Sequence, residues 1–160
     1  MANRILIVDD DEDAVAMIRH HLVRADYEVL YALDGIQALA LATREAPDLV
    51  VCDICMPEFD GFGLLAALRA NETTQALPVV FLTALDDPDS VTRATRMGAD
   101  GYLPKPVLRE ALLETVAAKL RLQEQRLAAR ETEGDVARKA QAIATTALNV
   151  VRLATVPRQS

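Results

Sequence analysis

Short apolar segments alternate with longer amphipathic segments along most of the chain. Five apolar runs have the length of strands and cover residues 5–8, 27–32, 49–53, 79–82 and 101–103. Between these runs, and after the last one, apolar residues recur every three or four positions, which is typical of helices with one buried face. The first run, Ile-Leu-Ile-Val at 5–8, contains no polar residue, so it predicts a strand that is buried on both faces.

This alternation predicts a doubly wound α/β domain. Five strand-helix repeats give a five-stranded parallel sheet with helices on both faces and right-handed crossovers. The fifth run is followed by Pro104 and Pro106, which cannot donate to a sheet, so we expect it at an edge. Residues 86–90 are acidic and contain Pro88, and we predict a loop there, followed by a short helix over 91–97.

Charge separates the last 40 residues from the rest of the 160-residue chain. Residues 1–120 hold 10 Lys and Arg against 20 Asp and Glu, whereas residues 121–160 hold 7 against 4. We therefore expect one domain over 1–120 and a separate extension over 121–160. The net charge of -7 argues against a sequence-independent nucleic-acid-binding protein, so we expect no direct nucleic-acid partner.

The sequence also limits location and cysteine chemistry. No apolar run approaches membrane-spanning length, and no signal-peptide pattern precedes the first run, so we expect a cytoplasmic protein without a membrane partner. Cys52 and Cys55 form a C-x-x-C pair, but a redox or zinc site would need a helix N-terminus or a second ligand pair. We expect Cys52 to behave as a small buried hydrophobic residue.

Polar residues follow four of the predicted strands. They are Asp9 and Asp10, Asp53, Thr83 and Lys105. Because parallel strands end at the same edge of a sheet, these side chains are expected to lie together. Several neighbouring carboxylates favour a bound cation, and oxygen ligands favour Mg²⁺. A carboxylate beside Mg²⁺ and an ammonium group can accept a phosphoryl group, because both cations offset its charge.

These motifs together resemble the receiver domain of two-component response regulators. Four segments carry the resemblance, in order: Ile-Leu-Ile-Val-Asp9-Asp10; Asp53-Ile-Cys-Met-Pro57 with Asp60-Gly61; Phe-Leu-Thr83-Ala84; and Gly98-Ala-Asp100-Gly-Tyr102-Leu-Pro-Lys105-Pro106. Each segment alone is a weak signal, but all four at these spacings are specific. The resemblance covers residues 3–120 and implies the strand order 2-1-3-4-5.

The resemblance assigns roles around Asp53, which it implies is the phosphoacceptor for a histidine kinase or a phosphotransfer protein. Asp10 would bind Mg²⁺ directly and Asp9 through water, together with Asp53 and the backbone carbonyl of Cys55. Lys105 would contact the phosphoryl oxygens. Such a protein is a phosphorylated signalling protein rather than an enzyme, because it catalyses only its own phosphorylation and dephosphorylation.

The resemblance also implies a switch. Thr83 would move toward the phosphoryl group and Tyr102 would follow inward, which alters the face made of the fourth helix, the fifth strand and the fifth helix. Thr83 could instead be an ordinary β-branched strand end, and Tyr102 a fixed core aromatic residue. The Lys105-Pro106 bond is expected to be cis.

Four positions modify this picture. Gly101 stands where the family often has an acidic residue, which loosens the fifth strand, and Pro104 stiffens the segment that positions Lys105. Cys55 and Leu85 stand where the family tunes phosphoryl lifetime. Neither side chain orients a hydrolytic water well, so we expect a long-lived aspartyl phosphate.

Two other classes of protein fit part of the pattern. Asp9-x-Asp11 after a strand, with Thr83 and Lys105 later, resembles the haloacid-dehalogenase phosphatases, in which the first Asp is the nucleophile. That pattern leaves Asp53 without a role. The third class is a pseudo-receiver that binds partners without phosphorylation, and the intact acidic residues argue against it.

The extension over 121–160 is predicted to be helical. Gly134 is expected to interrupt it, with Asp135 as the N-cap of a second helix. Apolar residues then alternate at spacings of four and three, which indicates a heptad seam: Val136, Ala140, Ile143, Ala147, Val150 and Ala154. An amphipathic helix needs a partner surface, so we expect a homodimer through these helices or through the switch face, or else a linker to an output domain.

Overall fold

A computed structural model describes residues 2–84 and 87–154 of the chain. Strands and helices alternate throughout. In chain order the elements are β1 (Arg4–Val8), α1 (Glu12–Arg24), β2 (Glu28–Ala32), α2 (Gly35–Glu45), β3 (Leu49–Asp53), α3 (Gly61–Ala70), β4 (Val79–Ala84), α4 (Pro88–Arg96), β5 (Gly101–Lys105) and α5 (Arg109–Ala154). The division into two compact units falls after Arg121.

The strands of the first unit form one parallel sheet in the order β2-β1-β3-β4-β5, as predicted. β1 and β3 lie at the centre, where their residues Ile5–Val8 and Leu49–Asp53 are buried throughout. β5 lies at an edge, which agrees with its two prolines. The doubly wound α/β fold is confirmed.

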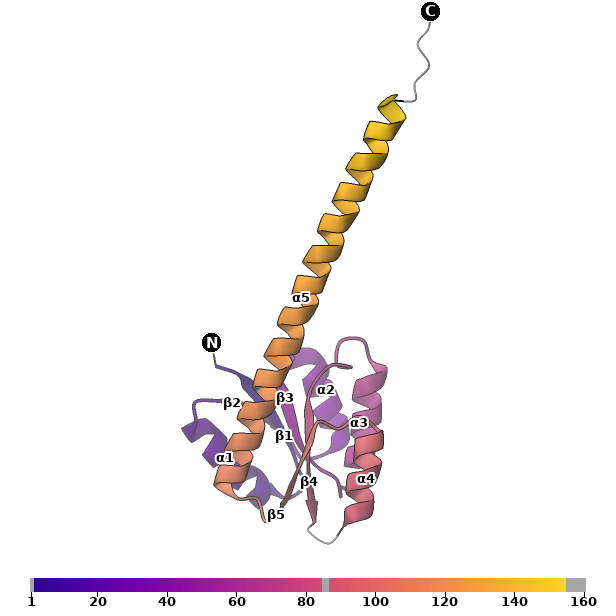
Figure 1. Cartoon of the computed structure of the whole chain (residues 1–160). Helices are drawn as coiled ribbons and strands as arrows, with labels where there is room; N and C mark the ends of the chain where they lie inside the picture. Colours follow the sequence, from indigo (N-terminus) through magenta and orange to yellow (C-terminus); the bar gives the residue numbers. More distant parts are fainter. Residues whose placement is uncertain (1, 85–86, 155–160) are drawn as a thin grey trace, which may run out of the picture. The chain divides into compact units, whose positions relative to one another are not determined.

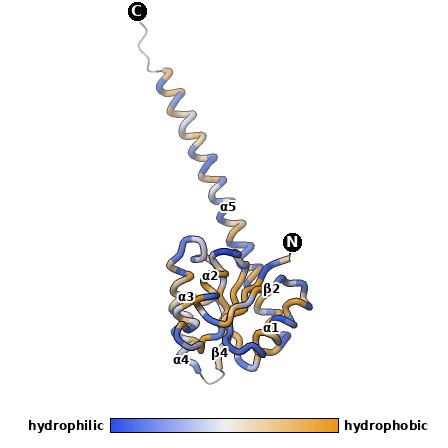
Figure 2. The backbone as a smooth tube through the Cα atoms, turned by 180° about the vertical axis from the view of Figure 1, so that it is seen from behind, coloured by the Kyte–Doolittle hydropathy of each residue, from blue (hydrophilic) through white to orange (hydrophobic). Residues whose placement is uncertain are grey.

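Helices cover both faces of this sheet (Figure 1). Side chains such as Leu6, Val50 and Phe81 point to the face that α2, α3 and α4 cover. Their neighbours Ile5 and Val51 point to the other face, against α1 and the first part of α5. The hydrophobic strands therefore lie between two polar-faced helical layers (Figure 2), and the sheet edge with the strand ends is held by a core on both sides.

Capping residues set where the helices near this edge begin. The Asp11 carboxylate accepts hydrogen bonds from the backbone of Asp13 at 2.9 Å and of Ala14 at 3.4 Å, so part of the acidic run is an N-cap. Asp60 caps α3 in the same way, at 2.8 Å from the nitrogen of Gly63. A Cβ on Gly61 would lie 2.7 Å from the carbonyl oxygen of Asp53, so only glycine lets α3 approach the end of β3 this closely.

The start of α4 differs from the prediction. The helix begins at Pro88, not at residue 91, because Asp87 serves as the N-cap and proline is compatible with the first turn of a helix. Asp87 accepts hydrogen bonds from the hydroxyl and the backbone of Ser90, and these bonds lower the pKa of its carboxyl. The acidic loop predicted over residues 86–90 therefore ends at Asp87, and residues 88–90 form the first turn of α4.

A charged network fixes the opposite edge of the sheet, where β4 and β5 begin. Arg69 of α3 donates to the carbonyl oxygens of Leu77 at 2.6 Å and Gly98 at 3.0 Å, and to Asp100 at 3.0 Å. Asp100 also accepts from the backbone nitrogen of Val79 at 2.8 Å. The C-terminal end of α4 and the start of β5 are thereby tied to α3 and β4.

The helix α5 runs without interruption from Arg109 to Ala154, and the predicted break at Gly134 is wrong. Its first turns bury Leu112, Val116 and Leu120 against the sheet. The residues after 121 belong to the second unit, where nearly every side chain is exposed. No helix in the described part of the chain combines the length and hydropathy that crossing a membrane requires.

Candidate phosphoacceptor site

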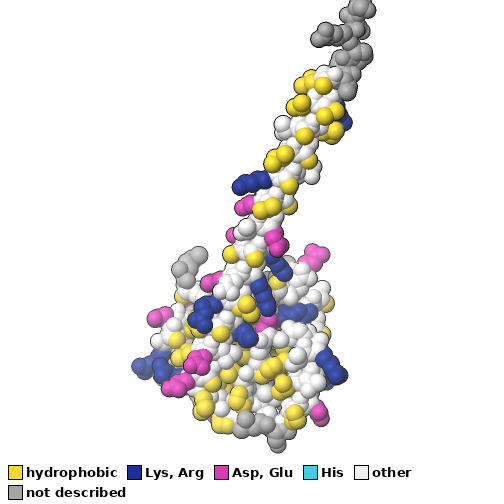
Figure 3. All heavy atoms as spheres, viewed as in Figure 1, with side chains coloured by type: hydrophobic (Ala, Val, Ile, Leu, Met, Phe, Trp, Pro, Cys, Tyr) yellow, Lys and Arg dark blue, Asp and Glu magenta, His cyan; other side chains and the backbone are white. Residues whose placement is uncertain are grey.

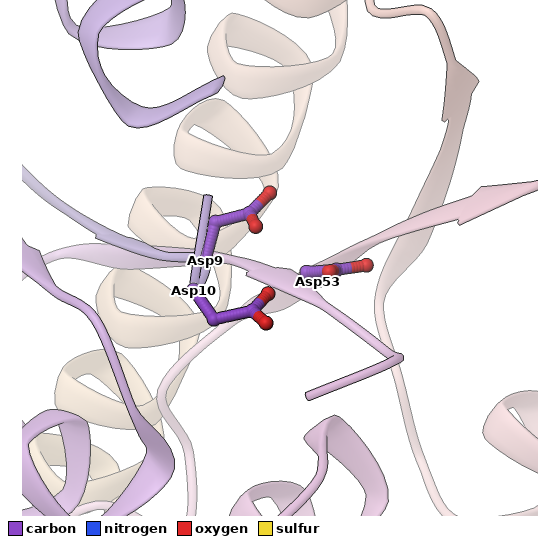
Figure 4. A group of neighbouring side chains, drawn as sticks. All are labelled: Asp9, Asp10 and Asp53. Atoms are coloured by element: carbon purple, nitrogen blue, oxygen red, sulfur yellow. The ribbon is translucent and has the colours of Figure 1, made fainter. Parts of the chain in front are cut away.

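Three aspartates meet at the carboxyl edge of the sheet. Asp9 and Asp10 follow β1, and Asp53 is the last residue of the neighbouring strand β3. One carboxylate oxygen from each lies within 4.8 Å of those of the other two, and Figure 4 shows the Asp9 and Asp10 side chains extending to the side where Asp53 lies. Asp9 is fully buried and Asp53 is 7% exposed, whereas Asp10 is open to solvent.

The Lys105 ammonium joins two of these carboxylates. Its Nζ lies 3.1 Å from Oδ2 of Asp9 and 3.2 Å from Oδ2 of Asp53. Lys105 ends β5, and its bond to Pro106 is cis, as predicted. The backbone nitrogen of Asp11 donates to the second Asp9 oxygen at 3.0 Å, and that of Cys55 to Asp53 at 3.4 Å. Both buried carboxylates are thus oriented by donors from separate elements.

Burial and neighbouring charges shift the pKa values of Asp53 and Lys105. Burial raises the pKa of the Asp53 carboxyl, the nearby Asp9 carboxylate raises it further, and Lys105 partly offsets both effects. Burial by itself lowers the pKa of Lys105, but the Asp53 and Asp9 carboxylates outweigh it, so the pKa of the ammonium is raised. Lys105 is therefore a permanent cation at neutral pH, next to a carboxylate whose charge is poorly stabilised.

The donor set fits Mg²⁺. All candidate side-chain ligands are carboxylate oxygens, which are the ligands that hard divalent cations prefer. The exposed Asp10 gives access from solvent, and repulsion between Asp9 and Asp53 is the unfavourable term that a cation relieves. Cys55 is exposed, and its backbone nitrogen lies 3.4 Å from a carboxylate oxygen of Asp53, so its backbone is next to the cluster.

The remaining predicted residues lie on neighbouring strands. Thr83, at the end of β4 beside β3, is 7% exposed, and its hydroxyl donates to the Ala84 carbonyl at 3.3 Å. Tyr102 of β5 pairs with Phe81 and is partly buried. Leu85, which was expected to affect phosphoryl lifetime, lies outside the described residues, so the long lifetime stays a prediction.

One contact was not anticipated from the sequence. The Tyr102 hydroxyl shares a hydrogen bond with the Thr95 hydroxyl on α4. Thr95 is exposed and sits in a helix with a single buried residue, Ala94, so no sequence pattern distinguishes it. α4 also contacts α3 through Arg93, whose guanidinium carbon lies 4.1 Å from the centroid of the Phe62 ring.

Cys52 takes no part in the edge cluster. It is fully buried in β3, and its thiol donates to the Asp53 carbonyl oxygen at 3.1 Å. Burial, and then the charge of Asp53, raise the thiol pKa well above its usual value, so the thiol stays protonated. This environment is that of a packing residue.

Comparison with known proteins agrees with this geometry. The family model described as the response regulator receiver domain matches residues 5–117. The transcriptional regulator RpaA of Synechocystis is 42% identical over 118 residues, which cover 74% of this chain and 49% of RpaA. The response regulator PleD of Caulobacter vibrioides is 41% identical over 107 residues, which cover 67% of this chain and 24% of PleD.

A solved structure resembles the chain over a similar extent. The chemotaxis protein CheY4 of Vibrio cholerae superimposes with a TM-score of 0.70 and 34% identity, covering 74% of this chain and 98% of CheY4. The matched region therefore spans about half or less of the curated relatives RpaA and PleD, and almost the whole of the CheY4 structure.

Proposed function

Because the chain belongs to the response regulator receiver domain family, we propose that a phosphoryl group on Asp53 switches it. The phosphoryl donor is a histidine kinase or a phosphotransfer protein. The observation that carries the proposal is the cluster of three carboxylates within 4.8 Å of one another, in which Lys105 bridges Asp9 and Asp53. We assign the receiver to residues 1–120 and a helical extension to 121–160.

Asp53 and Lys105 have different roles in the proposed phosphoryl transfer. An Asp53 carboxylate oxygen attacks the phosphorus of the donor phosphohistidine, so that a P–O bond forms, the P–N bond breaks and the imidazole leaves. Lys105 moves its ammonium from the carboxylates to the incoming phosphoryl oxygens, whose negative charge it offsets. The aspartyl phosphate carries more negative charge than the free carboxylate, so its formation beside the buried Asp9 carboxylate relies on Lys105 and a bound cation to offset that charge.

Mg²⁺ is the cofactor in this proposal. Asp10 and Asp53 would hold it directly, Asp9 would hold it through water, and Cys55 would contribute its backbone carbonyl. When bound, the ion would offset the charges of the carboxylates and of the transferred group. Both cations of the site are thus expected to speed the acceptance of a phosphoryl group.

The switch is proposed to run through Thr83 and Tyr102. The Thr83 hydroxyl exchanges its bond to the Ala84 carbonyl for one to the phosphoryl group. Tyr102 then leaves Thr95 and turns inward, which changes the surface of α4, β5 and α5. The output is a protein contact: either an unidentified protein partner reads this surface, or two copies pair through it or through the C-terminal helix.

Labelling with acetyl phosphate tests the proposal. With Mg²⁺ present we expect up to one phosphoryl group per chain, none in Asp53→Asn, and none after chelation of the metal. Asp26→Asn, an exposed position with a positive φ of 68° that asparagine tolerates, is the matched control and should label normally. Undiminished labelling of Asp53→Asn would refute the proposal, and no labelling of the wild type would favour a pseudo-receiver.

A further inference from the structure

The last part of α5, residues 136–154, presents large apolar side chains to solvent. Val136 is 61% exposed, Ile143 71% and Val150 60%. Figure 3 shows hydrophobic side chains gathered along this part of the helix with few charged ones between them. Such a surface on a helix that is not part of the receiver core requires a partner.

The spacing of this surface indicates that the partner is another helix. Val136, Ile143 and Val150 recur every seven residues, and Ala140, Ala147 and Ala154 recur every seven residues between them. A strict seven-residue repeat keeps a narrow seam in register with a second helix through a left-handed supercoil. Leu148, Val151 and Leu153 are also exposed, at 54%, 57% and 78%, and lie outside the seam, so the seven-residue repeat rather than the width of the apolar surface indicates a helical partner.

The seam is complementary to itself when a second copy runs in the opposite direction. A two-fold axis level with Thr145 places Ala140 opposite Val150 of the second copy, Ala147 opposite Ile143, and Ala154 opposite Val136. Every layer then combines one small and one β-branched residue, which fills the interface evenly. A parallel pair would alternate layers of two alanines with layers of two β-branched residues, and the alanine layers would be loosely packed.

The charged residues that precede the seam favour the same direction. Glu133 and Arg126 continue the four-three spacing toward the N-terminus. In a parallel pair, each would face its own copy across the seam, which places like charges in an apolar interface. In the antiparallel pair about Thr145, neither Glu133 nor Arg126 lies opposite its own copy.

We infer that residues 136–154 pair two copies of this chain as antiparallel helices centred on Thr145. The inference gives a direction and a register to the pairing included in the proposed function. It does not depend on Asp53, so the two can fail separately. The partner is a second copy of this chain, held by an apolar seam.

Disulfide crosslinking of the full chain tests direction and register together. Cys55 is exposed and is replaced by Ser in the two crosslinking variants only, whereas Cys52 is buried and is kept. A mixture of Ala140→Cys and Val150→Cys, incubated to exchange subunits, is expected to crosslink efficiently, and either variant alone only weakly. In the antiparallel pair the two Ala140 positions are about 15 Å apart along the axis, too far for a disulfide.

Mass in solution supplies the second readout. Ile143→Ala keeps helix propensity but removes two buried side chains per dimer, so we expect the dissociation constant to rise roughly 100-fold. Thr145→Ala, on the outer side of the same turn, is the matched control and should leave it unchanged. Labelling of Asp53 should be normal in both variants.

Four outcomes would overturn the inference. Crosslinking of Ala140→Cys to itself would show a parallel pair. A wild-type chain that stays monomeric at high concentration would exclude pairing, and a monomer that gains affinity for anionic phospholipid vesicles would assign the seam to a membrane surface. Equal dissociation constants for Ile143→Ala and wild type would place the interface elsewhere on the chain.

Discussion

Asp53 lies in surroundings that destabilise its ionised carboxylate. It is nearly buried, Asp9 stands beside it, and the single ammonium group that reaches it, among the described residues, is shared with Asp9. These surroundings raise the pKa of Asp53 above its usual 3.8. The folded protein is therefore destabilised by ionisation of Asp53 when no cation is bound at the site.

Asp53→Asn should stabilise the protein in the absence of divalent cations. Because the folded pKa is raised, the wild type loses stability as the pH rises from the unfolded value through the folded pKa, and the loss is complete above it. At neutral pH we expect the variant to be more stable than the wild type, and the difference should disappear as the pH falls below the unfolded value of 3.8. Urea unfolding in EDTA measures this, with Asp26→Asn as control; a variant less stable than wild type at pH 7 would contradict it.

Lys105 is the cation that the site itself supplies. Its ion pairs to Asp9 and Asp53, at 3.1 and 3.2 Å, hold it beside the oxygen that we expect to accept phosphate. Lys105→Gln should slow labelling by acetyl phosphate at least roughly 10-fold, because a charged hydrogen bond to the transferred oxygens is lost. Lys119→Gln removes the same charge from α5 and should label at the wild-type rate. Equal rates for the two variants would remove Lys105 from the reaction.

At the scale of elements, α4 and β5 are joined by the bond between the hydroxyls of Thr95 and Tyr102. This bond keeps Tyr102 at the surface side of β5 while Thr83 donates to Ala84. The Arg69 network holds Gly98 and Asp100, which are close in sequence to Thr95 and Tyr102, so this bond joins α4 and β5 near the ends that the network fixes. We expect the strength of the bond to set how readily Tyr102 makes the proposed inward turn.

Thr95→Val should release Tyr102 without phosphorylation. The chain has three tyrosines, so ¹⁹F spectra of the fluorotyrosine-labelled protein contain few signals, and Tyr102→Phe assigns the relevant one. In Thr95→Val that signal should move part of the way to its position in the beryllofluoride-bound wild type. Thr95→Ser, which keeps the hydroxyl, should leave it in place. An unmoved signal in Thr95→Val would show that the hydroxyl bond does not hold Tyr102.

The continuous helix through Gly134 gives another element-scale prediction. A Cβ at Gly134 would meet no atom within 4 Å, and the residue is helical. Gly134→Ala should therefore stabilise this part of α5 by about 0.5–1 kcal/mol and slow its proteolysis, because alanine loses less backbone entropy in a helix. Faster proteolysis or lower helicity by circular dichroism would instead support the break that the sequence suggested.

At the scale of the whole molecule, the sheet was predictable because its strands are short and buried. The uninterrupted apolar runs at 5–8 and 49–52 exclude half-exposed strands, and the prolines of β5 exclude its central placement. Parallel strands share one carboxyl edge, so the meeting of Asp9, Asp10 and Asp53 followed from the strand assignments. The roles of these residues in phosphoryl transfer remain predictions.

Three features could not be predicted from the sequence, because they depend on tertiary contacts or on small differences in local free energy. The bond of Thr95 to Tyr102 depends on where α4 crosses β5, and α4 carries almost no apolar pattern. The helix continues through Gly134 because a single glycine weakens a helix by only about 1 kcal/mol, which flanking helix formers exceed. Pro88 opens α4 because a proline stops a helix from within but not at its first turn.

Locating the phosphoryl group on the chain tests the central claim most directly. The wild type is treated with acetyl phosphate and Mg²⁺, the acyl phosphate is reduced with borohydride, and the peptides are sequenced by mass spectrometry. We predict modification at Asp53 alone, with Asp9 and Asp10 unmodified. Modification at Asp9 in place of Asp53 would contradict the account and support the phosphatase-type nucleophile instead.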